Sequence, residues 1–162
     1  MNRFLGQEKA SIDSSGRLKL PSVYYSLFDE GGVGELILYC LPEGAVGIYP
    51  IETWKEIREL EEAQKKLAAH SFVHRRQMRQ FGAMSQQVSL SKQGRITIPA
   101  LFREFASIDN SEPIILAGVE IGLEIWNADR WKAEMLDIQN HYNTKASQEM
   151  NLDLTGMGYE EN

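Results

Sequence analysis

Apolar and polar residues alternate with a period of two in two short stretches of the chain. Residues 17–20 read Arg-Leu-Lys-Leu and residues 95–98 read Arg-Ile-Thr-Ile, and each stretch follows a glycine and precedes a proline. Alternation of this kind is typical of a half-buried strand, and proline ends the ladder because it has no amide hydrogen. Each stretch therefore predicts a turn, a short strand and a stop.

The two stretches belong to a longer internal repeat. Arg95 follows Arg17 by 78 positions, and the same offset aligns Gly16 with Gly94 and a Leu-Ile-Leu run with an Ile-Ile-Leu run. Repetition at a fixed offset indicates two copies of one structural unit. Two isolated strand pairs would leave long exposed edges, so we expect the copies to complete each other's sheet in one barrel-like core.

Helical patterns lie outside these strands. Short helices are predicted after each proline, at 22–28 and 100–106. The linker at 55–82 is acidic in its first turns and basic in its last, which suits the helix dipole. A further amphipathic helix is predicted at 129–142, and the polar residues 143–162 are expected to form a loosely ordered tail.

The domain organisation follows from these elements. The prediction is a mainly β chain with helices, in the order first unit 7–54, helical linker with a basic cluster 55–82, second unit 83–128, C-terminal helix 129–142 and tail 143–162.

Charge changes this picture, because it is unevenly distributed. The net charge of −6 over 162 residues argues against a nucleic-acid partner, since duplex binding depends on neutralising phosphates. Residues 63–103, however, contain eight Lys and Arg residues and no Asp or Glu. Such segregation indicates one basic face on an acidic protein.

The remaining composition excludes several classes. No apolar run is long enough for a signal peptide or a membrane helix, so we expect a cytoplasmic protein without a membrane partner. Cys40 is the single cysteine and lies in the apolar run Glu-Leu-Ile-Leu-Tyr-Cys-Leu. It has no second cysteine for a disulfide or a metal site, so a packing role is expected.

The loop Asp-Ser-Ser-Gly-Arg at 13–17 has the residues of a recognition element. Gly16 supplies the positive φ of a tight turn, and Asp13 can accept hydrogen bonds from loop amides or pair with Arg17. An oriented guanidinium binds a phosphate or the O6 and N7 edge of guanine. The alternative is a structural hairpin in which Asp13 and Arg17 only brace the turn.

These residues carry a family resemblance. The segments IDSSGRLKLP and LSKQGRITIPALFREFA resemble the two SpoVT-AbrB-type motifs of the MraZ family of bacterial transcriptional regulators. The resemblance implies a pseudo-twofold, double-split (swapped-hairpin) β-barrel and a ring-shaped homo-oligomer. It also implies binding to short direct repeats of double-stranded promoter DNA, at a division and cell-wall operon, by a cytoplasmic and nucleoid-associated protein.

The candidate DNA-binding residues are the loop residues and the polar or basic side chains beside them: Asp13, Gly16, Arg17, Lys19, Lys92, Gln93, Gly94, Arg95 and Arg103. The two halves depart from the family pattern in different places. Ser91 stands where the second loop usually has Asp, and Tyr25 stands where the first half usually has Arg after its proline. A serine can accept a hydrogen bond but cannot form an ion pair with Arg95.

Other functions are weaker interpretations of the same sequence. His70 and His74 have the i, i+4 spacing of metal ligands, but the intervening glutamate of a zinc protease is missing. No cofactor, metal or catalytic constellation is predicted, so the chain is not expected to be an enzyme. Two non-enzymatic alternatives keep the fold: an antitoxin whose acidic tail binds a partner, and an oligomeric scaffold that does not bind DNA.

Overall fold

The computed structural model describes residues 3–29, 34–59, 71–109 and 113–157, and the chain separates into two units, 1–128 and 129–162. The strands of the first unit are β1 (Gln7–Ala10), β2 (Arg17–Lys19), β3 (Glu35–Leu41), β4 (Ala45–Pro50), β5 (Ser85–Ser89), β6 (Arg95–Thr97), β7 (Ile114–Gly118) and β8 (Leu123–Asn127). Its helices are α1 (Ser22–Asp29), α2 (Ile51–Glu59), α4 (Phe72–Ala83) and α5 (Ala100–Ala106). Helix α6 (Ala128–Met157) forms the second unit.

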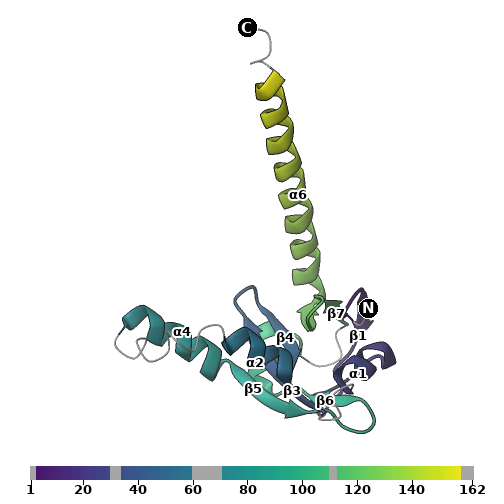
Figure 1. Cartoon of the computed structure of the whole chain (residues 1–162). Coiled ribbons are helices and arrows are strands. Elements are labelled where there is room, and N and C mark those ends of the chain that lie inside the picture. The colour runs from purple at the N-terminus through teal and green to yellow at the C-terminus, as the bar shows by residue number, and fades with distance from the viewer. Residues whose placement is uncertain (1–2, 30–33, 60–70, 110–112, 158–162) are drawn as a thin grey trace. The chain divides into compact units, whose positions relative to one another are not determined.

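The strand order has the symmetry that the repeat predicts. A six-stranded antiparallel sheet runs β1-β7-β8-β4-β3-β5, and a two-stranded ribbon pairs β2 with β6 (Figure 1). The strands β1, β2, β3 and β4 of the first half correspond to β5, β6, β7 and β8 of the second. Exchanging each strand for its counterpart gives the same two sheets, read from the opposite edge. Because β1 pairs with β7 and β5 pairs with β3, each half completes the sheet of the other. The predicted β fold with exchanged strands is confirmed, although the pairings of the described strands form two sheets rather than one closed barrel.

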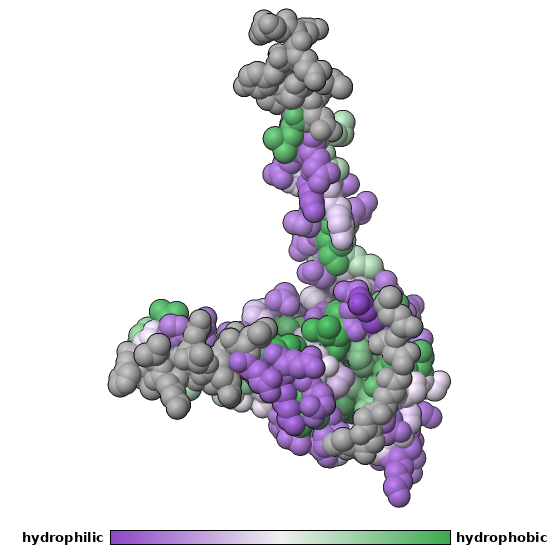
Figure 2. All heavy atoms as spheres, viewed as in Figure 1, coloured by the Kyte–Doolittle hydropathy of each residue, from purple (hydrophilic) through white to green (hydrophobic). Residues whose placement is uncertain are grey.

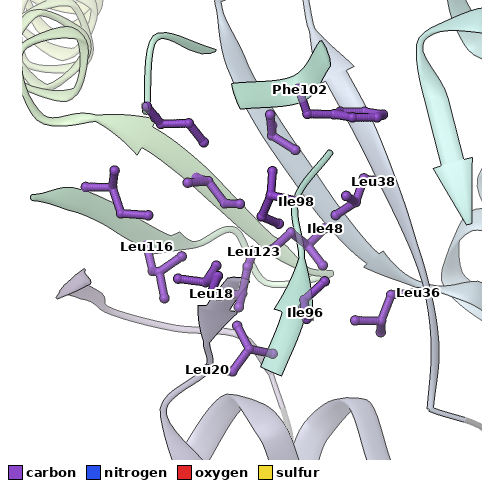
Figure 3. Packing of buried hydrophobic residues seen from close by; sticks show 14 of the residues in the cluster. Leu18, Leu20, Leu36, Leu38, Ile48, Ile96, Ile98, Phe102, Leu116 and Leu123 are labelled. Atoms are coloured by element: carbon purple, nitrogen blue, oxygen red, sulfur yellow. The ribbon is translucent and has the colours of Figure 1, made fainter. Parts of the chain in front are cut away.

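The core lies between the ribbon and the larger sheet. Leu18 and Ile96 face each other across the ribbon, and both side chains are fully buried. They pack with residues such as Leu38, Ile48 and Leu116 from the six-stranded sheet (Figure 3). Full burial of each such side chain stabilises the fold by roughly 1.5–3 kcal/mol.

Proline and helix positions follow the sequence pattern. Pro21 and Pro99 come directly after the ribbon segments, and α1 and α5 begin just beyond them, which confirms the two predicted short helices. Proline suits a helix start because the first amides of a helix have no intrahelical partner. The lone Cys40 is buried in the core cluster, in agreement with its expected packing role.

Strands β3 and β4 are buried on both faces, because α2 and α4 cover the side away from the core. Tyr39 on β3 lies 5.3 Å from the ring centroid of Trp54 and 5.4 Å from that of Phe81. Tyr49 on β4 lies 5.9 Å from Trp54, and its burial raises the pKa of the phenol to about 12. This aromatic layer fixes α2 and α4 on the sheet.

The helical regions differ from the prediction at two places. Residues 60–70 of the predicted linker helix lie outside the described residues, and α2 and α4 flank them. The C-terminal helix does not end at 142 but continues to Met157, so residues 143–157 are helical rather than a loose tail. Residues 143–155 contain neither Gly nor Pro and are rich in good helix formers.

Helix α6 carries apolar side chains among its polar ones. Met135, Leu136, Ile138 and Tyr142 are all exposed, and Figure 2 shows apolar and polar surface interspersed along this unit. Within the described ranges, no helix combines the length and the apolar character needed to span a membrane.

Candidate nucleic-acid interface

The first loop, residues 13–17, is closed by its aspartate. The amide of Gly16 donates to the carbonyl of Asp13 at 2.9 Å, and Gly16 has a φ of +79°. One carboxylate oxygen of Asp13 accepts from the amides of Ser15 and Arg17, each at 2.9 Å. The second oxygen accepts from the Arg17 Nε at 3.1 Å. The aspartate therefore holds both the turn and the guanidinium.

Electrostatics of the first loop favour the charged carboxylate. The hydrogen bond from the Arg17 amide is the largest cause that lowers the pKa of Asp13 from its usual 3.8, and the Arg17 charge acts in the same direction. Asp13 consequently remains ionised at neutral pH and paired with Arg17. The structure contains both contacts expected of Asp13, those with the loop amides and that with the Arg17 side chain.

The second loop, residues 91–95, has the same turn but fewer side-chain contacts. The amide of Gly94 donates to the carbonyl of Ser91 at 3.0 Å, and Gly94 has a φ of +77°. The Ser91 hydroxyl accepts from the Arg95 amide at 3.0 Å, as Asp13 does from Arg17. Serine has no second oxygen, and within the described part of the chain no side chain pairs with the Arg95 guanidinium. The two arginines are therefore presented differently.

Each loop is fastened to the other half of the molecule. The carbonyl of Gly16 accepts from the amide of Ile98 at 2.8 Å, and the carbonyl of Gly94 accepts from the amide of Leu20 at 2.8 Å. Both glycines are buried, and their positive φ is a conformation that other residues rarely adopt. These two reciprocal hydrogen bonds fix the distance between the two loops, one at each end of the ribbon.

Arg103 and Tyr25 occupy equivalent positions behind the two loops. A Cβ at Gly16 would lie 3.3 Å from the Cζ of Arg103, and a Cβ at Gly94 would lie 3.1 Å from the Tyr25 ring. Arg103 also donates from Nε to the carbonyl of Ile98 at 3.0 Å and lies 3.6 Å from the Asp109 carboxylate. Its side chain is only one-fifth exposed. The structure thus holds Arg103 against the back of the first loop.

The register of the ribbon gathers the remaining charges on one face. Arg17 pairs with Thr97, and Lys19 pairs with Arg95, while Leu18 between them points to the core. Because side chains alternate along a strand, these four polar residues share the outer face. The outer face of the ribbon therefore carries three cations and one threonine, two side chains from each strand.

Two hollows flank this ribbon. One has a volume of about 240 Å³ and is lined by Arg17, Ser89, Leu90, Ser91, Gln93, Arg95 and Thr97. The other has a volume of about 190 Å³ and is lined by Lys19, Leu20, Ser22, Tyr25, Lys92, Gln93 and Gly94. Six of the nine predicted site residues line these hollows, Asp13 and Gly16 shape the first loop, and Arg103 packs behind that loop without lining either hollow.

Sequence reasoning missed several residues of this surface. Thr97 shares the exposed face with Arg95, and the period-2 pattern of the strand could have identified it. Tyr25 was seen as a replacement for an arginine, but nothing in the sequence placed its ring against Gly94. Ser89 enters through the pairing of β5 with β3, which no local pattern specifies.

Three basic linker residues, Arg75, Arg76 and Arg79, lie on α4, at a different place in the fold. Arg76 and Arg79 are exposed, and the Arg76 guanidinium lies 5.4 Å from the centroid of the Phe72 ring. His74 is on the same helix, whereas His70 lies outside the described residues. In the described ranges, no three His, Cys, Asp or Glu side chains gather as a metal site would require.

Comparison with known proteins decides the family. Residues 82–154 match a family model described as "MraZ protein, putative antitoxin-like". A protein of Clostridium acetobutylicum named "Transcriptional regulator MraZ" is 34% identical over 79% of this chain and 84% of its own length. The chain belongs to the MraZ family. The resemblance inferred from its two Gly-Arg motifs is confirmed.

Other MraZ relatives give the same result. The MraZ proteins of Heliobacterium modesticaldum and Syntrophobacter fumaroxidans are 33% and 31% identical to this chain, over 89% and 82% of its length. The two alignments cover 89% and 84% of the relatives' own lengths, so both repeats are included. These MraZ relatives are named as transcriptional regulators and not as enzymes, which agrees with the prediction of a non-enzymatic protein.

Proposed function

We propose that this protein is a sequence-specific DNA-binding transcriptional regulator of the MraZ type. It binds short repeats of promoter DNA as a ring-shaped homo-oligomer, at a division and cell-wall operon, and acts in the cytoplasm in association with the nucleoid. The observation that carries the proposal is the pair of glycine-fastened loops that present Arg17 and Arg95 on one exposed ribbon.

The charge and shape of the ribbon suit a duplex. Arg17, Lys19 and Arg95 share its outer face, and Lys92 and Gln93 are exposed in the second loop beside them. A two-stranded β-ribbon fits the major groove of B-DNA, where arginine forms bidentate hydrogen bonds with guanine. The net charge of −6 is no obstacle, because four cations, Arg17, Lys19, Lys92 and Arg95, lie together on and beside the ribbon.

The residues of the candidate site divide into contacting and supporting groups. Arg17, already held by Asp13, is the base-reading side chain, since an oriented guanidinium loses little freedom on binding. Lys19, Lys92, Gln93 and Arg95 make the remaining DNA contacts. Gly16, Gly94 and Arg103 act as positioning residues through their contacts behind the loops.

Oligomerisation supplies the affinity that one ribbon lacks. A single subunit offers a small contact area, whereas linked subunits engage successive repeats with a high effective concentration and without any new contact per subunit.

Fluorescence anisotropy with cognate and scrambled promoter duplexes tests the proposal. Arg17→Ala should weaken binding to the cognate duplex by about 1–3 kcal/mol and relax selectivity at one base pair. Arg79→Ala on α4 is the matched basic control, and a phosphate contact there would weaken all sequences alike. Equal loss on cognate and scrambled duplexes for Arg17→Ala would refute base reading.

An antitoxin-like role is the second candidate, because the matched family model carries that word in its description. An antitoxin would bind a protein partner through its C-terminal segment, here the helix α6. Removal of residues 143–162 separates the two functions. Promoter affinity that survives the truncation supports the regulator, and a stable complex with a partner protein that is lost with these residues supports the antitoxin.

A further inference from the structure

The larger hollow beside the ribbon has the size and the lining of an anion site. It has a volume of about 240 Å³, the space of several water molecules at roughly 30 Å³ each. Its wall includes two guanidinium groups, those of Arg17 and Arg95, together with the side chains of Ser91, Gln93 and Thr97. A phosphodiester group fits a space of this size.

The two arginines contribute different charges to this hollow. The Asp13 carboxylate lies 3.1 Å from the Arg17 Nε and offsets the positive charge of that residue. Arg95 has no such partner among the described residues, and Lys19 stands directly opposite it in the ribbon. An anion is therefore attracted to the Arg95 side of the hollow.

Hydrogen-bond donors also line this hollow. The Ser91 oxygen accepts from the Arg95 amide, which leaves its hydroxyl hydrogen free to donate. The side chains of Gln93 and Thr97 have no hydrogen-bond partner within the described ranges and line the same hollow. A guanidinium, two hydroxyls and an amide are the groups that proteins use to hold backbone phosphates.

The part of the lining that comes from β5 is less favourable to an anion. Ser89 donates its hydroxyl to the Glu35 carboxylate at 2.8 Å, so it is already satisfied. Gln87 also donates to Glu35, and this bond together with that from Ser89 lowers the pKa of the carboxyl and keeps it charged. The negative charge of Glu35 directs an anion toward Arg95.

We infer that this hollow is the seat of one DNA backbone phosphate, held by Arg95 with Ser91, Gln93 and Thr97, while Arg17 reads the adjacent base edge. The inference rests on the proposed function and divides its two loops: the first specifies sequence and the second anchors the strand. Serine in place of aspartate at position 91 is then a functional feature, because a carboxylate there would repel the phosphate.

A methylphosphonate scan of the cognate duplex tests this division of roles. Each backbone phosphate in turn is replaced by a neutral methylphosphonate, and the affinity of the full chain is measured. For each bound ribbon, methylphosphonate at one position should lower the affinity about tenfold, both for the wild type and for Arg17→Gln. That cost should vanish in Arg95→Gln and shrink in Thr97→Val, a milder change that keeps the β-branched shape. Base-pair substitutions should give the reverse pattern, with sensitivity lost in Arg17→Gln.

Two results of the scan would overturn the inference. One is a full methylphosphonate cost that persists in both Arg95→Gln and Thr97→Val, and the other is a scan without any sensitive position. Failure of the wild type to bind the duplex at all would instead refute the proposed function.

In that event a second measurement tests whether the hollow binds a phosphate group. Inorganic phosphate and pyrophosphate are titrated into the full chain while the Nε–Hε NMR signals of Arg17 and Arg95 are followed. A saturable shift confined to Arg95 would support a seat for phosphate from a free source, and the absence of a shift would overturn it.

Discussion

Replacing Ser91 by aspartate would give the second loop the contact that only the first loop has. The Ser91 hydroxyl accepts from the Arg95 amide at 3.0 Å, close to the 2.9 Å at which Asp13 accepts from the Arg17 amide. In Ser91→Asp, one carboxylate oxygen keeps this bond and the second reaches the Arg95 Nε. The variant should therefore orient Arg95 and offset its charge.

The expected magnitudes for folding and for binding differ. An exposed ion pair changes the free energy of unfolding by no more than about 1 kcal/mol, so the variant should be as stable as the wild type or slightly more stable. Loss of one phosphate contact per ribbon should weaken cognate DNA binding by about tenfold. It should also flatten the dependence of log K on log salt by about 0.9 for each lost contact.

Fluorescence anisotropy across a salt series, together with thermal unfolding, measures both effects. Ser91→Asn is the matched control, because it keeps the acceptor for the Arg95 amide and adds no charge. Its affinity and salt slope should resemble those of the wild type. If Ser91→Asp binds with wild-type affinity and an unchanged slope, Arg95 does not anchor a phosphate and the account of the second loop is wrong.

Three further predictions concern the loops. Asp13→Asn keeps the backbone bonds but loses the ion pair, so discrimination at the base read by Arg17 should fall several-fold in competition anisotropy; unchanged discrimination would contradict the orienting role. Gly16→Ala and Gly94→Ala should each lower the free energy of unfolding by about 1–2 kcal/mol in urea titrations, because both positions have positive φ, whereas Gly82→Ala in helix α4 should raise it. Because the folded-state pKa of Asp13 lies below 3.8, the stabilisation of the loop by its carboxylate is complete above pH 3.8 and is lost as the pH falls through the lowered pKa. The Arg17 Nε–Hε NMR signal should report this loss of pairing. Loss of the pairing above pH 5 would refute this assignment.

Local patterns in the sequence were sufficient for much of the fold. Alternation around Leu18 and Ile96 predicted the two ribbon strands, and the 78-residue offset between Arg17 and Arg95 predicted their equivalence. The turn glycines were identifiable because a tight turn before a strand needs a positive φ. These features depend on neighbours in the chain, which is why a single sequence reveals them.

Features that depend on tertiary contacts were not accessible in the same way. Arg103 looks like a surface cation in the sequence, but the exchange of strands brings Gly16 of the other half against its guanidinium, which also donates to the nearby Ile98 carbonyl. Thr97 and Ser89 join the larger hollow only once the strand partners are known. At the C-terminus, polar composition suggested a loose tail, whereas helix propensity carried α6 to Met157.

The most direct test of the account is the affinity of the wild-type chain for the DNA upstream of its own gene, measured against a scrambled duplex across a salt series. A sequence-specific regulator of this kind should clearly prefer the natural sequence, and its affinity should fall steeply with salt, since several phosphates are contacted in each complex. Equal affinity for both duplexes, or no binding even at low salt, would contradict it.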